Sequence, residues 1–101
     1  MSKTIVIKEK FANDYTTRQA GERLKSIIME SSGKIELDFI ELKVASTSFF
    51  DEAIGKLSEE GNSGKEILKK IVISHIHELD YELLSQVCQS RGISPPIRKI
   101  S

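Results

Sequence analysis

Tryptophan is absent from this 101-residue chain, which has only one cysteine and two prolines. Long apolar runs are also absent. The longest are a few residues, whereas a helix needs roughly 20 to cross a bilayer. The N-terminus has no apolar segment of the kind found in signal peptides. We therefore expect a cytoplasmic protein with no membrane partner.

Net charge is missing as well, because fifteen basic residues balance fifteen acidic ones. No overall field draws the chain to nucleic acid, which is not an expected partner. The single cysteine, Cys88, has no internal disulfide partner. It lies in a helical apolar pattern, where cysteine usually behaves as a small buried hydrophobic residue. We expect Cys88 to be structural.

The composition is 39% hydrophobic, and the 30% of residues that are charged sum to no net charge. This excludes the class of disordered chains that combine low hydrophobicity with high net charge. The length corresponds to one ordinary domain. We therefore expect a single domain over residues 1–101, with a core over about 4–92 and a C-terminal tail at 93–101.

Short β-branched or alternating segments in the sequence alternate with longer amphipathic ones. The short segments predict strands at 4–8, 34–39 and 71–74. The amphipathic segments predict helices at about 16–31, 50–60 and 80–92. A capping box of Thr16 and Gln19 is expected to start the first helix, and Asp80 is expected to cap the third.

This β-α-β-α-β-α order predicts a small α/β domain with right-handed crossovers. We expect a mostly parallel or mixed sheet with helices mainly on one face. The apolar positions predicted to share one core are Leu37, Phe39, Phe50, Ile54, Ile73 and Leu84.

The most informative stretch runs from Leu37 to Leu57, where a strand leads through a serine-bearing turn into a helix. Its motifs, with one pair further upstream, are Thr17-Arg18, Leu37-Asp38-Phe39 and Ser46-x-Ser48-Phe49-x-Asp51-Glu52-x-x-Gly55. On these residues the chain resembles small bacterial STAS-like proteins, which are similar to anti-sigma factor antagonists. The resemblance covers most of residues 11–90. It implies a regulatory domain that binds another protein.

In anti-sigma factor antagonists, a serine at the start of this helix is phosphorylated by a cognate kinase. By resemblance, Ser48 is the first candidate for such regulation, followed by Thr47 and Ser46. The resemblance also implies the kind of partner: a serine kinase with a histidine-kinase-like ATP-binding fold, or an anti-sigma-like regulator.

Ser48 also has a structural interpretation. A serine before a helix accepts a backbone N–H of the first turn, and Asp51 would complete a Ser-x-x-Asp capping box. A phosphate there would be attracted by the helix N-terminus and repelled by Asp51 and Glu52. A cap and a regulated hydroxyl both remain open.

Five residues near this turn are candidates for partner contact: Arg18, Phe49, Asp51, Glu52 and Gly55. Phe49 is about 100° from Phe50 around the helix, and so lies beside the buried stripe. Gly55 lies away from that stripe and permits close backbone approach. Arg18 is either held by Asp14, bound to an acidic group of the partner, or solvated.

Other motifs carry less chemistry. The segment 61–66 lacks the spacing of a phosphate-binding loop, and no ligand pattern surrounds His75 and His77. We expect no metal, cofactor or catalytic residue, and therefore a regulatory protein-binding module rather than an enzyme. Two alternatives are a small hydrolase or transferase with its site at the C-terminal ends of the strands, and a structural oligomer-forming subunit.

Overall fold

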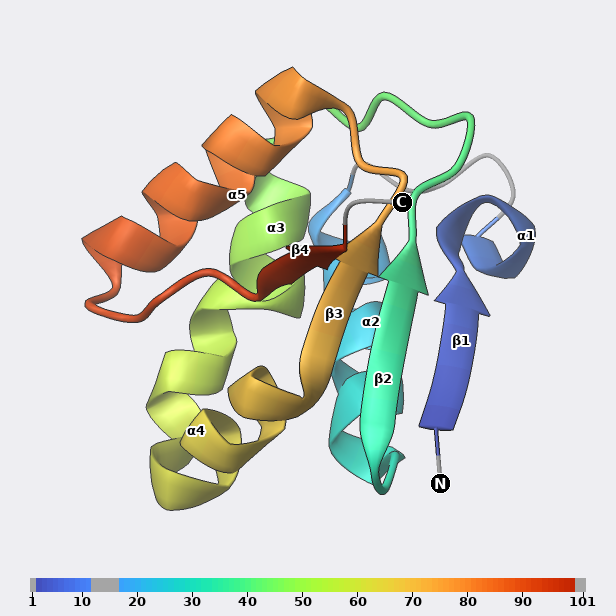
Figure 1. Ribbon diagram of the computed structural model, residues 1–101. Coiled ribbons are helices and arrows are strands. Elements are labelled where there is room, and N and C mark those ends of the chain that lie inside the picture. Colours follow the sequence, from blue (N-terminus) through green and yellow to red (C-terminus); the bar gives the residue numbers. More distant parts are fainter. Residues whose placement is uncertain (1, 12–16, 100–101) are drawn as a thin grey trace.

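A four-stranded parallel sheet lies at the centre of the computed structural model, which describes residues 2–11 and 17–99 (Figure 1). The elements in chain order are β1 (Ser2–Val6), α1 (Ile7–Phe11), α2 (Arg18–Glu30), β2 (Lys34–Asp38), α3 (Thr47–Ala53), the 3₁₀ helix η1 (Gly55–Glu60), α4 (Gly61–Lys70), β3 (Ile71–Ser74), α5 (Glu78–Ser90) and β4 (Ile97–Lys99). Among these described elements, no helix is both long enough and apolar enough to cross a membrane.

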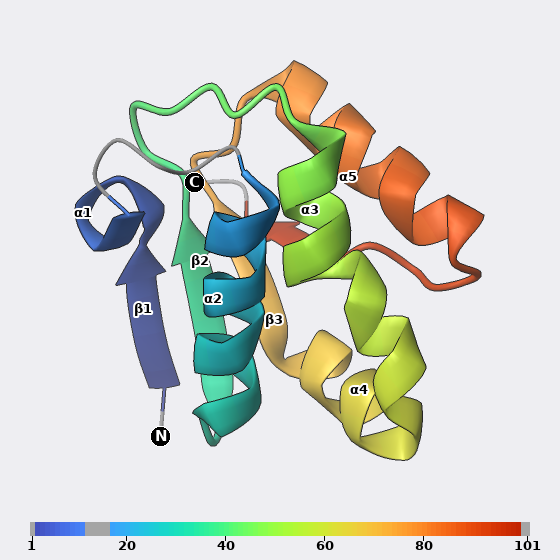
Figure 2. The ribbon, with the colours of Figure 1, turned by 180° about the vertical axis from the view of Figure 1, so that it is seen from behind.

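The strands follow one another across the sheet in the order β1-β2-β3-β4, and all three pairs are parallel. Right-handed crossovers between successive parallel neighbours place the connecting helices on the same side. Figure 2 shows α2 and α3 lying across one face, with α5 beside α3, whereas no helix crosses the face seen in Figure 1. The predicted α/β class, with helices mainly on one face, is confirmed.

The core fills the space between the sheet and these helices. Ile5, Leu37 and Ile73 stand next to one another in the register of β1, β2 and β3, and all three are buried. The six residues predicted to share a core are each fully buried and belong to one apolar cluster. The alternation and helical spacing that predicted them therefore identify the inward faces correctly.

Several element boundaries differ from the predictions. The first strand ends at Val6 and continues as α1, and the last residues before 100, expected to be part of a tail, include β4. The segment Gly61–Gly64, expected to end a helix, instead begins α4. A Cβ on Gly64 would collide with the carbonyl oxygen of Leu57, so glycine here allows α4 to lie against η1.

Two predicted caps need comment. Thr16 lies outside the described residues, and α2 begins after Thr17, whose hydroxyl accepts a 3.1 Å hydrogen bond from the backbone N–H of Ala20. The expectation that Asp80 caps the third helix is wrong. His77 is the cap of α5, where its Nδ1 accepts from the N–H of Leu79 at 3.2 Å. This leaves the carboxylate of Asp80 available for contacts outside its own helix.

Candidate functional site

The loop between β2 and α3 is held by Asp80 of α5. Its two carboxylate oxygens accept hydrogen bonds from the backbone N–H of Val44 at 2.6 Å and of Ala45 at 2.9 Å. Asp80 is only 1% exposed. Ala45 has a φ of 51°, a left-handed conformation that is unfavourable for a residue with a side chain. The buried carboxylate therefore holds the loop in a conformation that the loop sequence would not favour alone.

The helix that follows begins earlier than predicted. Ser46 has extended backbone angles, and its hydroxyl accepts from the N–H of Phe49 at 3.2 Å, which makes it the cap of α3. The predicted capping box of Ser48 and Asp51 is therefore wrong. Thr47 is exposed and Ser48 is partly exposed, both in the first turn. Capping is assigned to Ser46, so it does not account for the hydroxyl of Ser48.

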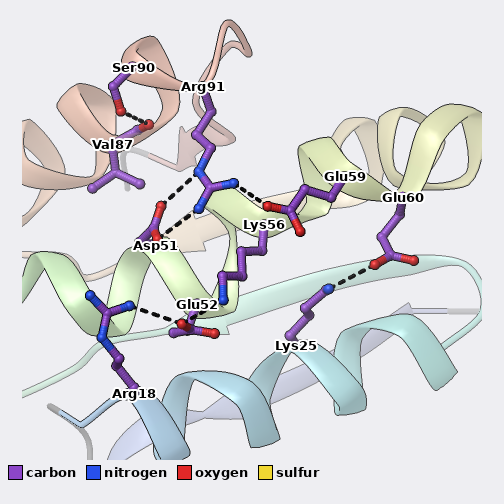
Figure 3. A network of polar contacts seen from close by, with 10 residues as sticks. All are labelled: Arg18, Lys25, Asp51, Glu52, Lys56, Glu59, Glu60, Val87, Ser90 and Arg91. Atoms are coloured by element: carbon purple, nitrogen blue, oxygen red, sulfur yellow. Dashed lines mark hydrogen bonds and ion pairs between the residues drawn. The ribbon is translucent and has the colours of Figure 1, made fainter.

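Glu52 is a buried carboxylate with two cationic partners (Figure 3). Lys56 approaches it at 2.8 Å from one turn later in the chain, and Arg18 approaches it at 2.9 Å from α2. The hydrogen bond from Lys56, together with that from Arg18, lowers the pKa of Glu52, although desolvation opposes the shift. Glu52 itself thus supplies the acidic partner of Arg18, whose side chain stays 58% exposed. Asp14, the intramolecular partner considered for Arg18, lies outside the described residues.

Asp51 points to the other side of α3, where it binds Arg91 at the end of α5 (Figure 3). The guanidinium donates to both carboxylate oxygens, at 3.0 and 2.9 Å, and also to Glu59 at 2.6 Å. These two carboxylates raise the pKa of Arg91. A two-pronged contact of this kind fixes orientation as well as distance, so it sets the position of α5 against α3 and η1.

Phe49 and Gly55 lie inside the structure, which corrects their predicted placement. Phe49 is fully buried, and its ring lies edge-on to Phe11 with 6.3 Å between centroids. A Cβ on Gly55 would lie 2.9 Å from a methyl carbon of Val87, so glycine permits close contact with α5. The prediction assumed a single buried face, whereas α3 packs against α2 on one side and α5 on the other.

Sequence reasoning missed several residues of this arrangement. A Cβ on Gly21 would lie 2.8 Å from the carbonyl oxygen of Phe49, so this glycine lets α2 approach α3 closely. Asp80 binds Val44 from 36 positions away in the chain, and Arg91 binds Asp51 from 40 positions away. No local sequence pattern links either residue to its partner. Lys56 could have been found, because it lies four residues after Glu52 on the same helical side.

The two histidines have separate structural contacts. His75 pairs through Nδ1 with Asp38 at 2.9 Å, and His77 caps α5. Across residues 2–11 and 17–99, no group of three or more histidine, cysteine or acidic side chains is placed to hold a metal ion.

A parallel sheet with helices on one face, and a hydroxyl-bearing turn between its second strand and the next helix, define a small α/β domain of the kind that the STAS-like resemblance implied. The family described as "STAS-like domain of unknown function (DUF4325)" matches residues 20–80, and the chain belongs to this family. The match includes the motif from Ser46 to Gly55 and the Asp80 clamp, by which we mean Asp80 with the backbone N–H groups of Val44 and Ala45. Arg18 and Arg91 lie outside the match. Comparisons with curated proteins and with solved structures gave no match.

Proposed function

We propose that this chain is a regulatory module that binds a protein partner and performs no catalysis itself. The contact would be made by a turn surface, which we define as the exposed residues of the loop and the start of α3: Ile40, Glu41, Lys43, Ala45 and Thr47, together with the partly exposed Ser48. Membership of a STAS-like family supports a regulatory role. The proposed partner is an ATP-binding serine kinase of histidine-kinase-like fold, or an anti-sigma-like regulator.

The observation that carries this proposal is the Asp80 clamp. Two backbone N–H groups of an otherwise surface loop are held by a carboxylate that is 1% exposed. Burying a charge is costly unless hydrogen bonds satisfy it. An apolar residue at position 80 would avoid this cost but would not hold the two N–H groups of the loop. Binding residues are commonly carried on loops that a rigid scaffold positions. A loop held in one shape loses little conformational entropy when a partner binds.

Ser48 is the proposed point of control. It lies one helical turn before Glu52 on α3, so the two side chains emerge on the same side of the helix. A phosphate on Ser48 would add about two negative charges to that side. Arg18, which is 58% exposed and bound to Glu52, is a cation that could turn to the phosphate. Lys56 would still hold Glu52, so the fold would tolerate the change while the charge of the turn surface is altered.

The test is affinity purification with the full chain as bait, from lysates of cells that express it naturally, with and without added ATP. The variant Ser48→Asp places a charge on the turn surface. Ser63→Asp is the matched control, because Ser63 is an exposed serine in the first turn of α4. We expect wild type and Ser63→Asp to recover the same partner, and Ser48→Asp to bind it more than tenfold more weakly, a loss of about 1.4 kcal/mol.

The far-UV circular dichroism of all three proteins should be the same. A Ser48→Asp protein that binds the partner as wild type does, with no phosphate found on Ser46, Thr47 or Ser48 in cells, would contradict control at this turn. Failure to recover any specific protein in repeated trials would contradict the binding function itself.

A further inference from the structure

A groove of about 780 Å³ lies between α4 and the segment that joins α5 to β4. Its apolar lining comes from both sides: Leu68 of α4, and Ile93, Pro95, Pro96 and Ile97 of the joining segment and β4. Figure 1 shows α4 at the lower end of the molecule and the loop before α3 at the upper end. The groove is therefore separate from the turn surface.

Ile97 gives this groove an exposed apolar border. It is 68% exposed, more than any other large apolar side chain in the described part of the chain. It stands on β4, which pairs with β3 and lies at the edge of the sheet. An exposed branched side chain beside a concave apolar surface is the arrangement expected of a contact site.

The wall of the groove is rigid where it leaves α5. Gly92 has a φ of 72° and its N–H bonds to the carbonyl of Gln89, while the N–H of Ile93 bonds to the carbonyl of Cys88. These two bonds form a Schellman motif, which ends the helix in a defined direction. The anchoring of Arg91 by Asp51 and Glu59 precedes this motif directly.

Further along, the two prolines limit backbone freedom because their rings fix φ. The carbonyl of Pro96 accepts a 2.8 Å hydrogen bond from the hydroxyl of Tyr81. Arg98 covers the ring of the same tyrosine, with its guanidinium carbon 5.4 Å from the ring centroid. The groove is thus formed before any ligand arrives, which removes much of the ordering cost of binding.

The border formed by α4 is basic. Lys65 and Lys69 line the groove and are four residues apart, so they emerge on the same side of the helix. Both are exposed. Glu66 also lines the groove, where its Oε1 lies 3.7 Å from Nζ of Lys69. The two lysines therefore outnumber the single acid along this border.

We propose that this groove binds an acidic peptide segment of a second protein. The peptide would insert an aliphatic or aromatic side chain between Leu68 and Ile97, and would place carboxylates opposite Lys65 and Lys69. This surface is independent of the turn surface. A chain with both would bring two proteins together, one on each end of the domain.

The probe is a random twelve-residue peptide library displayed on phage, selected on the full wild-type chain. The consensus peptide is then synthesised and its affinity measured for three variants. Lys65→Glu with Lys69→Glu reverses the charge of the border. Lys3→Glu with Lys10→Glu makes the same net charge change at two other exposed lysines. Ile97→Asp removes the apolar border.

We expect a consensus with acidic residues around at least one large apolar residue. It should bind the Lys3/Lys10 variant as it binds wild type, and should bind the Lys65/Lys69 variant at least tenfold more weakly. Ile97→Asp should weaken it as well, whereas Ser48→Asp should not. Amide NMR shifts on titration should appear at Leu68 and Ile93.

Several results would overturn the proposal: no enriched peptide, a basic or neutral consensus, equal affinity for the two double variants, or shifts centred on Ser48. Analytical ultracentrifugation tests the remaining alternative, in which a second copy of the chain fills the groove. A concentration-dependent dimer that Ile97→Asp abolishes would show that a second copy of the chain, and not an acidic peptide, covers this groove.

Discussion

Asp80 and Val44, 36 positions apart in the chain, are joined by a 2.6 Å hydrogen bond from a backbone N–H to a buried carboxylate. The shape of the loop before α3 is therefore determined by α5, and the two should respond together to a change at either residue.

Replacing Asp80 by asparagine tests this link. The amide would keep one acceptor oxygen but turn an NH₂ group toward the N–H of Val44 or Ala45, so one buried donor would lose its acceptor. We expect a loss of about 1 to 3 kcal/mol in the free energy of unfolding. Hydrogen exchange at both amides should become faster. Glu78→Gln, at an exposed acid on the same helix, is the control. Unchanged exchange at Val44 and Ala45 would show that the carboxylate does not hold the loop.

The cap of α3 can be assigned by comparing two single substitutions. Ser46→Ala removes the hydroxyl that accepts from Phe49, and should cost about 1 kcal/mol. Ser48→Ala removes a partly exposed hydroxyl that is not the cap, and should change stability by less than about 0.5 kcal/mol. Urea unfolding of both proteins measures the difference. A larger loss for Ser48→Ala than for Ser46→Ala would contradict the assignment.

Glu52 should contribute to the pH dependence of stability. Its cationic partners lower its pKa in the folded protein below the ordinary value of 4.5. The stabilisation is therefore complete above that value, and is lost as the pH falls through the lower folded-state pKa. Glu52→Gln should cost about 1 to 2 kcal/mol at pH 7, because it weakens hydrogen bonds to charged groups. The gap between variant and wild type should shrink below pH 4.5.

Urea unfolding at a series of pH values from neutral to strongly acidic measures this gap. Glu22→Gln, which removes an exposed charge on α2, is the matched control. A gap for Glu52→Gln that stays constant over the whole range would mean that its ionisation is not linked to folding.

Cys88 should be unreactive in the folded protein. Burial raises the pKa of its thiol to about 11, and the thiolate is the reactive form. At pH 8 a water-soluble disulfide reagent should label the native chain slowly and the urea-unfolded chain at once. Fast labelling of the native protein would show that the helix carrying Cys88 opens readily or that the thiol is accessible.

The core could be predicted from the sequence because its signals are local. Leu37 and Phe39 alternate with polar residues, and Phe50 and Ile54 repeat at helical spacing. β4 could not be predicted in this way. It is three residues long and follows two prolines, so it is too short to show any period.

The motif around α3 contains the helix cap, but the sequence assigned that cap to Ser48 in place of Ser46. Three hydroxyl residues stand in a row at 46–48, and any of them can serve as a cap. Sequence alone does not choose among them. Asp51 and Glu52 find their partners on α5 and α2 through the packing of helices, which depends on contacts far apart in the chain. Gly55 is explained only when α5 is in place beside it.

The strands occupy the sheet in the order of their synthesis. Each strand therefore pairs with the strand made immediately before it, and no pairing has to wait for a later segment to fill a central gap. β2 is enclosed once β3 is made, and β4 is added last. The turn surface needs the chain only as far as Asp80 of α5, whereas the groove also needs the segment from Ile93 to Ile97, so the turn surface can be completed before the groove.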